Sequence, residues 1–417
     1  MIITMAEADA PRLRPDIEAF PVVYQGREGV AIRDALGLIA RPVVVQGEAL
    51  ILLRLLDGRR TLRDIQETLV RLRGGALVTC DEVRGWLDEL DAAFILDGPR
   101  YRTARMKLAA DYARRRVRAA ALAGESYPAR RDLLERELDR ILSGAPQAGS
   151  SPDARGPLAG LAAPHIDLAS GAPGYAAAYG VLDAAAPAPD LVVLFGTGHS
   201  LDGGYLALTE KDFRTPLGLA RTDRETVRAL RRAAGSAAAP DDLAHRREHS
   251  LEFQLLFLQR RLGREFALVP ILWGSFAKDL RRVSRPSELP GVAEVIACLR
   301  ETISRRDRRA LVVAGVDLSH IGPKFGHDRS ARALRAAAEA HDRRLLEAAG
   351  RGDVEAFWAE SRRVGDAYNV CGFASLACVL EVLAPVSGRL LAYEMTMEEA
   401  TRSGVSYAAL AFYRPEP

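Results

Sequence analysis

Residues 191–199, Leu-Val-Val-Leu-Phe-Gly-Thr-Gly-His, decide how this chain folds. Five apolar residues in a row, ended by glycines, are typical of a strand buried on both faces of a sheet. Two further apolar runs end beside a histidine in the same way: residues 161–164 before His165, and residues 311–316 before Asp317 and His320. In an open α/β sheet, ligands bind just outside the carboxyl ends of the strands. His199 and its two counterparts are therefore predicted at the ligand-binding end of one sheet.

Beyond residue 160, strand-like runs alternate with helix-like segments. Further strands are expected at 205–208, 266–272, 389–394 and 405–413, and helices at 224–234, 248–262, 292–305, 330–348 and 373–383. This alternation predicts a layered α/β domain with a largely parallel or mixed sheet.

Length and composition limit the remaining possibilities. A chain of 417 residues is too long for one compact core, so two domains are expected. The net charge is only +3, and nearly all basic residues are arginines. This bias weakens any inference from arginine density to nucleic-acid binding. Residues 100–118 carry eight basic residues against one acid and are either a solvated linker or the footprint of a partner.

Several absences in the sequence predict a cytoplasmic protein without membrane contact. No run of about 18 uncharged apolar residues occurs, so no membrane-spanning helix is expected. Residues 1–16 contain acids and arginines but no apolar segment, unlike a secretory signal. Four cysteines in a chain of this length give no disulfide framework.

The first 102 residues are expected to form a separate domain. Helices are predicted at 47–56, at 62–72 with Thr61 as its N-cap, and at 79–93, followed by a hairpin at 94–101. Three helices followed by a hairpin are the pattern of a winged helix. Residues 55–65 resemble the PqqD-like peptide-recognition module, and this resemblance implies binding of a leader peptide by strand addition.

Winged helices also bind DNA, but the third predicted helix has Arg84 and few other basic residues. A peptide or protein partner is therefore preferred over nucleic acid. Residues 103–122 are expected to form a helical connector, which leaves residues 123–417 for the α/β domain.

Four segments carry the candidate chemistry. His165 follows Pro164, which ends its strand, and two glycines present His199. His249 and Glu252 lie three residues apart on one side of a helix. Glu248 and Glu252 either suit the helix N-terminus as acids, or this segment supports the site or does acid–base work beside it.

The other two segments lie further along the chain. Asp317 and His320 follow the most apolar strand and can orient each other or bind a metal ion. Cys371 stands just before a helix, whose dipole favours the thiolate. It is a candidate metal ligand, nucleophile or redox thiol, or alternatively a small buried residue.

The ordered series of motifs resembles the Memo family, known in bacteria as AmmeMemoRadiSam system protein B. The resemblance rests on segments 123–128, 163–165, 196–199, 215–218, 248–252, 317–320 and 371–372. It implies a fold similar to class III extradiol dioxygenases, a layered α/β domain with a mixed sheet. It also implies binding of Fe(II) or Cu by His165, His199 and Cys371, and imidazole and thiolate ligands suit these metals. Asp167 departs from the family pattern and adds a carboxylate beside His165.

Three functions remain open at this point. The first is a metal-dependent redox enzyme in which Asp317, His320 and His249 transfer protons or contact the substrate. The second is a non-catalytic adaptor whose cleft holds a peptide and whose N-terminal domain recruits a partner, for example a radical-SAM enzyme. The third is a cysteine-dependent hydrolase with Cys371 as the nucleophile.

Overall fold

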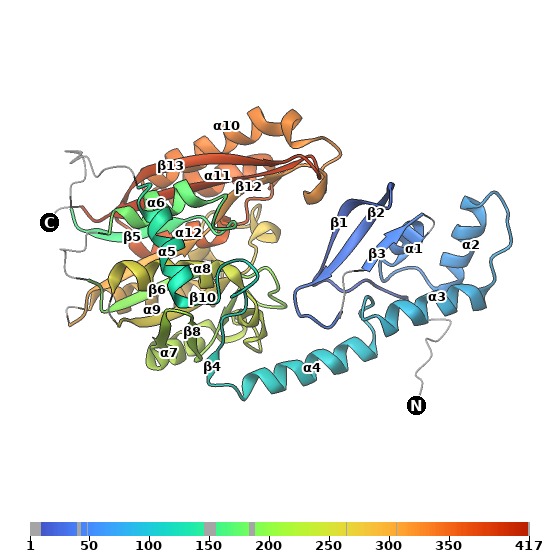
Figure 1. Cartoon of the computed structure of the whole chain (residues 1–417), viewed down its shortest axis with the longest axis horizontal. Coiled ribbons are helices and arrows are strands. Elements are labelled where there is room, and N and C mark those ends of the chain that lie inside the picture. Colours follow the sequence, from blue (N-terminus) through green and yellow to red (C-terminus); the bar gives the residue numbers. More distant parts are fainter. Residues whose placement is uncertain are drawn as a thin grey trace. The chain divides into compact units, whose positions relative to one another are not determined.

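The computed structural model describes residues 10–39, 43–47, 49–145, 156–182, 188–263, 265–305 and 307–415. The chain divides into two compact units, Met1–Tyr112 and Ala113–Pro417 (Figure 1). Each unit has its own hydrophobic core. Among the helices of these described segments, none is both long and apolar enough to cross a membrane.

The first unit begins with a small antiparallel sheet that the sequence did not predict. Its strands, in the order β1-β2-β3, are β1 (Ile17–Tyr24), β2 (Arg27–Asp34) and β3 (Val43–Gln46). The loop between β1 and β2 is Gln25-Gly26, and both residues have positive φ angles of 50° and 74°. Two such residues match the right-handed twist of a tight hairpin. The Gln-Gly pair is therefore the sequence signal for this sheet.

Helices follow the sheet. They are α1 (Ala49–Leu55), α2 (Leu62–Leu72), α3 (Cys80–Ala92) and α4 (Pro99–Ala113). The three predicted helices correspond to α1, α2 and α3 and are confirmed. The predicted cap is also confirmed, because the Thr61 hydroxyl accepts from the backbone N–H of Asp64 while Asp64 accepts from the Thr61 backbone.

The predicted hairpin at 94–101 is wrong. Pro99 begins α4, where its fixed φ suits the first helical turn and its missing N–H costs nothing. Before it, Leu96 forms an isolated bridge to Leu13 instead of pairing with residues after the turn. In the described part of this unit the strands thus precede the helices, and no wing follows α3. The predicted connector at 103–122 is helical only to Ala113.

The second unit alternates strands and helices as predicted. Its strands are β4 (Val117–Arg118), β5 (Leu158–Ala163), β6 (Leu191–Thr197), β7 (Leu206–Leu208), β8 (Asp212–Thr215), β9 (Gly218–Thr222), β10 (Ala267–Trp273), β11 (Ala310–Gly315), β12 (Asp317–Ile321), β13 (Ser387–Glu398) and β14 (Ser403–Tyr413). Its helices are α5 (Arg131–Leu142), α6 (Ala172–Gly180), α7 (Arg224–Ala234), α8 (His249–Leu262), α9 (Val292–Ser304), α10 (Ala331–Gly350), α11 (Val354–Val364) and α12 (Phe373–Leu383). The bounds of α7 and α12 are those predicted.

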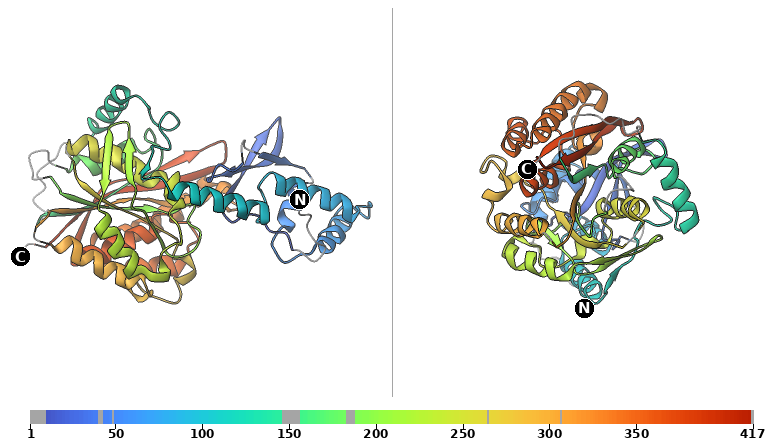
Figure 2. Two further views of the ribbon diagram at one scale, coloured as in Figure 1. Left: turned by 90° about the horizontal axis from the view of Figure 1, so that it is seen from below. Right: turned by 90° about the vertical axis from the view of Figure 1, so that its left-hand side faces the viewer.

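These strands form one mixed sheet in the order β12-β14-β5-β11-β6-β10-β9-β8-β4, with β13 beside β14 and β7 beside β10. The central strands β5, β11, β6 and β10 are parallel, whereas β14 runs antiparallel to β5. Helices cover both faces of the sheet (Figure 2). The prediction of a mixed α/β sheet is confirmed.

The buried apolar runs follow from this layering. In β6, Val193 and Phe195 pack against the core that includes α7, α9 and α12. Their neighbours Val192 and Leu194 pack against the opposite core, which includes α5, α6 and α8. Since successive side chains of a strand point to opposite faces, a strand covered on both faces must be apolar throughout. The same requirement explains the run in β11.

Candidate metal centre

Three neighbouring parallel strands end at the same edge of the sheet. In the pairing register, Ala163 of β5 lies beside Gly315 of β11, and Phe195 of β6 lies beside Ala314. The residues that follow these strands therefore lie close together, as the sequence predicts for histidines at the carboxyl ends of neighbouring strands.

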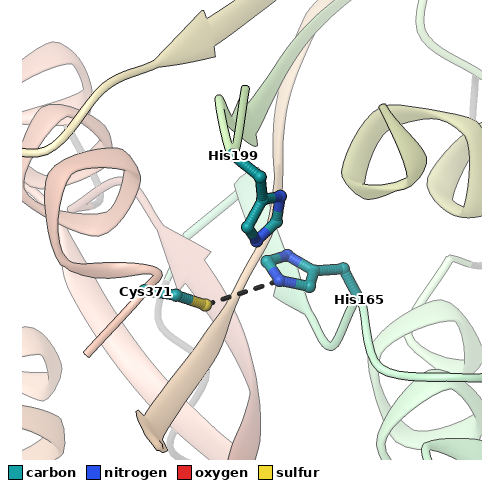
Figure 3. Close-up of side chains that lie close together, drawn as sticks. All are labelled: His165, His199 and Cys371. Atoms are coloured by element: carbon teal, nitrogen blue, oxygen red, sulfur yellow. Dashed lines mark hydrogen bonds between the residues drawn. The ribbon is translucent and has the colours of Figure 1, made fainter. Parts of the chain in front are cut away.

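His165, His199 and Cys371 converge at this edge (Figure 3). One ligand atom from each lies within 4.8 Å of the other two. The Cys371 Sγ is 3.4 Å from His165 Nε2. The next residue is glycine because a Cβ at Gly372 would lie 2.5 Å from the carbonyl oxygen of Asp317. The chain can therefore bring Cys371 this close only with glycine after it.

His165 is held by backbone groups and by Asp317. Its Nδ1 lies 2.9 Å from the Gly315 carbonyl oxygen, which can only accept, so Nδ1 carries the proton. Asp317 accepts from the backbone N–H of His165 at 2.9 Å, and its other oxygen lies 3.5 Å from His165 Nε2. His165 is 2% exposed. Its Nε2 is therefore fixed in orientation and directed toward Cys371.

His199 is oriented by Glu248, for which the sequence left open either a helix-terminal role or a supporting role beside the site. Its Nδ1 lies 3.1 Å from both carboxylate oxygens of Glu248. The same carboxylate lies 3.2 Å from His249 Nδ1 and accepts from the Ser250 backbone N–H at the start of α8. A carboxylate that holds the far nitrogen of a histidine is the usual support of a metal-binding imidazole. The signal in the sequence was an acid at the N-cap directly before a histidine.

His249 lies at the site, as predicted, whereas Glu252 does not. The His249 ring is stacked on His199, with ring centroids 4.9 Å apart. Glu252 is fully buried and pairs with Arg118 and Tyr127, away from the histidines. His249 and Glu252 lie on the same helix, but their side chains contact different groups.

Asp317 and His320 also lie close to Cys371. Each of the three offers a ligand atom within 4.8 Å of the others. The Nδ1 of His320 donates to the Leu318 carbonyl oxygen at 2.9 Å, which leaves Nε2 free of that bond. The sequence prediction that Asp317 and His320 lie at the site is therefore consistent with their positions.

Asp167 lies apart from the candidate ligands. Its side chain is exposed and accepts from the backbone N–H groups of Ala169 and Ser170 at 3.1 and 2.9 Å. Such bonds cap a local turn. In this structure Asp167 therefore serves as a turn residue.

The charges of the site are coupled. Burial alone would raise the pKa of Cys371, but His165 and His320 outweigh it and lower that pKa to about 5. Burial alone would lower the pKa of His165, but Asp317 and Cys371 raise it to about 9. Glu248 likewise outweighs burial and raises the pKa of His199. A thiolate thus faces two protonated imidazoles, and a cation bound here would replace their Nε2 protons.

The site is open on one side. The side chains of His199 and His249 are 33% and 35% exposed, whereas that of Glu248 between them is 3% exposed. Solvent or a small molecule can therefore reach the two imidazoles, while the carboxylate that orients them stays buried.

Known proteins match this chain over both units. The family model described as Memo-like protein matches residues 118–411. A MEMO1 family protein of Thermus thermophilus is 31% identical over 353 residues, which cover 84% of this chain and 98% of the relative. One of Methanopyrus kandleri is 32% identical and covers 71% of this chain and 99% of its own length. One of Aquifex aeolicus is 27% identical over 96% of this chain and its own full length, so that match includes residues of the first unit.

Proposed function

Because the chain belongs to the family of Memo-like proteins, we propose that it binds iron or copper through His165, His199 and Cys371 and acts as a redox enzyme. The observation that supports this proposal is the convergence of two imidazole nitrogens and one thiolate within 4.8 Å. This donor set fits Fe(II) or Cu better than Mg²⁺ or Ca²⁺, which prefer oxygen ligands.

When bound, iron or copper supplies one-electron chemistry, and the chain's own residues do the rest. Asp317 and His320 lie beside Cys371, and His249 shares the Glu248 carboxylate with His199. These groups are placed to accept and return protons within reach of the thiolate and the open side. Ring cleavage proper uses two histidines and a carboxylate, so Cys371 in the third position favours other redox chemistry.

Metal analysis tests the proposal. Protein purified without oxygen is expected to carry about one equivalent of iron or copper, and His199→Ala to carry much less. His327→Ala is the control, because His327 bonds to backbone oxygens of Gly322 and Ala367 outside the site. Stoichiometric zinc, or no metal together with weak binding of both added Fe(II) and Cu(I), would contradict the proposal.

Glu248→Gln is expected to weaken Fe(II) or Cu(I) binding about 10–100-fold, the usual cost of losing a carboxylate that orients a metal ligand. Glutamine keeps the size of the side chain but loses the charge that holds His199 and His249. Competition with a chelator of known affinity measures the change. Glu125→Gln on the exposed surface is the matched control. Unchanged affinity in Glu248→Gln would mean that His199 is not a ligand.

A second candidate function, peptide binding by the first unit, is favoured by one observation. A cavity of about 280 Å³ is lined by residues of β3, α1, α2 and α3: Val45, Ala49, Leu52, Leu53, Leu69, Arg73, Trp86, Glu89 and Leu90. Among the described residues, β3 pairs only with β2, so its outer edge can accept another strand. We propose that an extended peptide binds along this edge with an apolar side chain in the cavity.

Selection from phage-displayed random peptides tests peptide binding. Selected peptides are expected to slow amide hydrogen exchange in β3 of the full chain and to lose at least about tenfold in affinity for Leu53→Arg, which places a charge in the cavity. Leu133→Arg on α5 is the control, since Leu133 is 40% exposed. Peptides that bind Leu53→Arg equally well would exclude this site.

A further inference from the structure

The positions of Asp317 and His320 on β12 (Asp317–Ile321) conflict with a regular strand. Side chains three residues apart on a strand point to opposite faces. Yet Asp317 and His320 both bring a ligand atom to within 4.8 Å of the Cys371 Sγ. An irregularity in β12 must therefore reverse the direction of one of the two side chains.

A bulge in β12 provides that turn. Asp317 pairs with Tyr407 of β14, and His320 pairs with Val405, so three steps along β12 match only two along β14. The extra residue shifts the alternation by one and places His320 on the same side as Asp317. Bulges next to active sites commonly redirect a side chain in this way.

Ser319, which lies within the bulge, is held by the buried carboxylate of Asp342. Ser319 Oγ donates to Asp342 Oδ1 of α10 at 2.6 Å, and the Ser319 backbone N–H donates to Ser406 Oγ at 2.9 Å. Ser406 Oγ in turn donates to Asp342 Oδ2 at 2.6 Å. We call Ser319, Asp342 and Ser406 the clasp. These hydrogen bonds connect β12 and β14, the two strands at the bulge, to α10.

Burying the clasp costs folding free energy, which argues that these residues have a role beyond packing. Ser319, Asp342 and Ser406 are all 0% exposed. Among the residues that the structure describes, the hydrogen-bond partners of the Asp342 carboxylate are three hydroxyls, those of the two serines and of Tyr393. A buried carboxylate without a tightly paired cation costs free energy that an apolar residue in the same place would not. Packing of α10 on the sheet alone does not require it.

We infer that Asp342 is a positioning residue: through Ser319 and Ser406 it holds the bulge that brings Asp317 and His320 to one side of Cys371. The role of those two residues rests on the proposed function, but the clasp itself does not. Tyr393 bonds the same carboxylate from β13, whose backbone pairs with β14 and not with β12.

Histidine ring NMR tests the inference without a metal ion. The chain has seven histidines, so their ring Cε1–H signals can be resolved and assigned one by one by substitution. Asp342→Leu has a similar size but accepts no hydrogen bond, and it is expected to shift the signals of His320 and His165. The signals of His199 and His249 are expected to stay in place. Asp342→Asn, which can still bond both serines, and Tyr393→Phe are expected to leave all four unchanged. His341 is not used because it adjoins Asp342.

A metal titration of the same variants adds a second readout. Asp342→Leu is expected to bind Fe(II) or Cu(I) about tenfold more weakly than wild type, within the range for groups that act through a ligand's neighbour. If Asp342→Leu does not fold, Ser406→Ala replaces it with the same expectations. An unmoved His320 signal, or an equal shift in Tyr393→Phe, overturns the inference. A protein that binds no metal yet shows the His320 shift overturns the proposed function and supports the clasp.

Discussion

Replacing Glu252 by alanine is expected to lower the free energy of unfolding of the second unit by about 3–5 kcal/mol, because it leaves a buried charge without its partner. The Glu252 carboxylate pairs with Arg118 and accepts from Tyr127 OH. It also accepts from the backbone N–H groups of Ala121 and Leu122 at 2.9 and 3.0 Å. The Glu252 and Arg118 side chains are 0% and 2% exposed, so water cannot replace the lost bonds.

Urea unfolding followed by tryptophan fluorescence measures this loss. In a Trp86→Phe background the remaining tryptophans, Trp273 and Trp358, both belong to the second unit. Glu135→Ala is the control, because its pair with Arg131 is exposed and worth less than about 1 kcal/mol. A loss of less than about 1 kcal/mol in Glu252→Ala would show that the Arg118–Glu252 pair does not anchor the start of this unit.

The same ion pair shows what composition alone leaves undetermined. Most basic residues of 100–118 are exposed, as expected for a solvated basic segment, but Arg118 is buried inside its own unit. Its guanidinium bonds Glu252 and the backbone oxygens of His245 and Glu248. An arginine count along the chain cannot predict this, because the partners lie more than 120 residues away.

The sequence predicted the fold correctly where burial determines which positions of a strand or helix must be apolar. The doubly covered strands β6 and β11 must be apolar on both faces. The predicted bounds of α7 hold because one face of this helix is buried, and those of α12 hold because the whole helix is buried. The prediction failed around residues 94–101, where Gly98-Pro99 fits either a hairpin turn or the first turn of a helix. It also missed β1, in which Pro21 interrupts the strand pattern; as an edge strand, β1 tolerates this proline.

The candidate site was predictable in part for a topological reason. Parallel strands end at one edge, so residues that follow β5, β6 and β11 meet wherever these strands lie in the chain. The support of that site was only partly predictable. Glu248 acts on His199 across 49 positions, and the bulge in β12 depends on a register with β14 that no local pattern encodes.

Replacing Cys371 by alanine is expected to weaken binding of Fe(II) or Cu(I) about 1,000-fold. Structural zinc sites with four ligands gain roughly 10–16 kcal/mol, or about 4 kcal/mol at most per ligand, which corresponds to this factor. The Cys371 thiolate is expected to contribute a binding free energy at the upper end of that range, because it is the only anion among the three proposed ligands. The thiolate-to-metal charge-transfer band of Co(II)-substituted protein should also disappear. Chelator competition and absorption spectroscopy measure both effects.

The same variant separates metal binding from cysteine nucleophilic catalysis. The 3.4 Å contact between Cys371 Sγ and His165 Nε2 also suits a nucleophile and its base, so geometry alone serves both functions. Cys298→Ala, which removes a thiol from α9, is the control and should bind metal like wild type. Affinity within a few-fold of wild type in Cys371→Ala, with the charge-transfer band retained, would remove the thiolate from the ligand set. Loss of both would instead identify the low-pKa thiolate as the anionic ligand, because an imidazole pair alone gives neither the band nor the affinity.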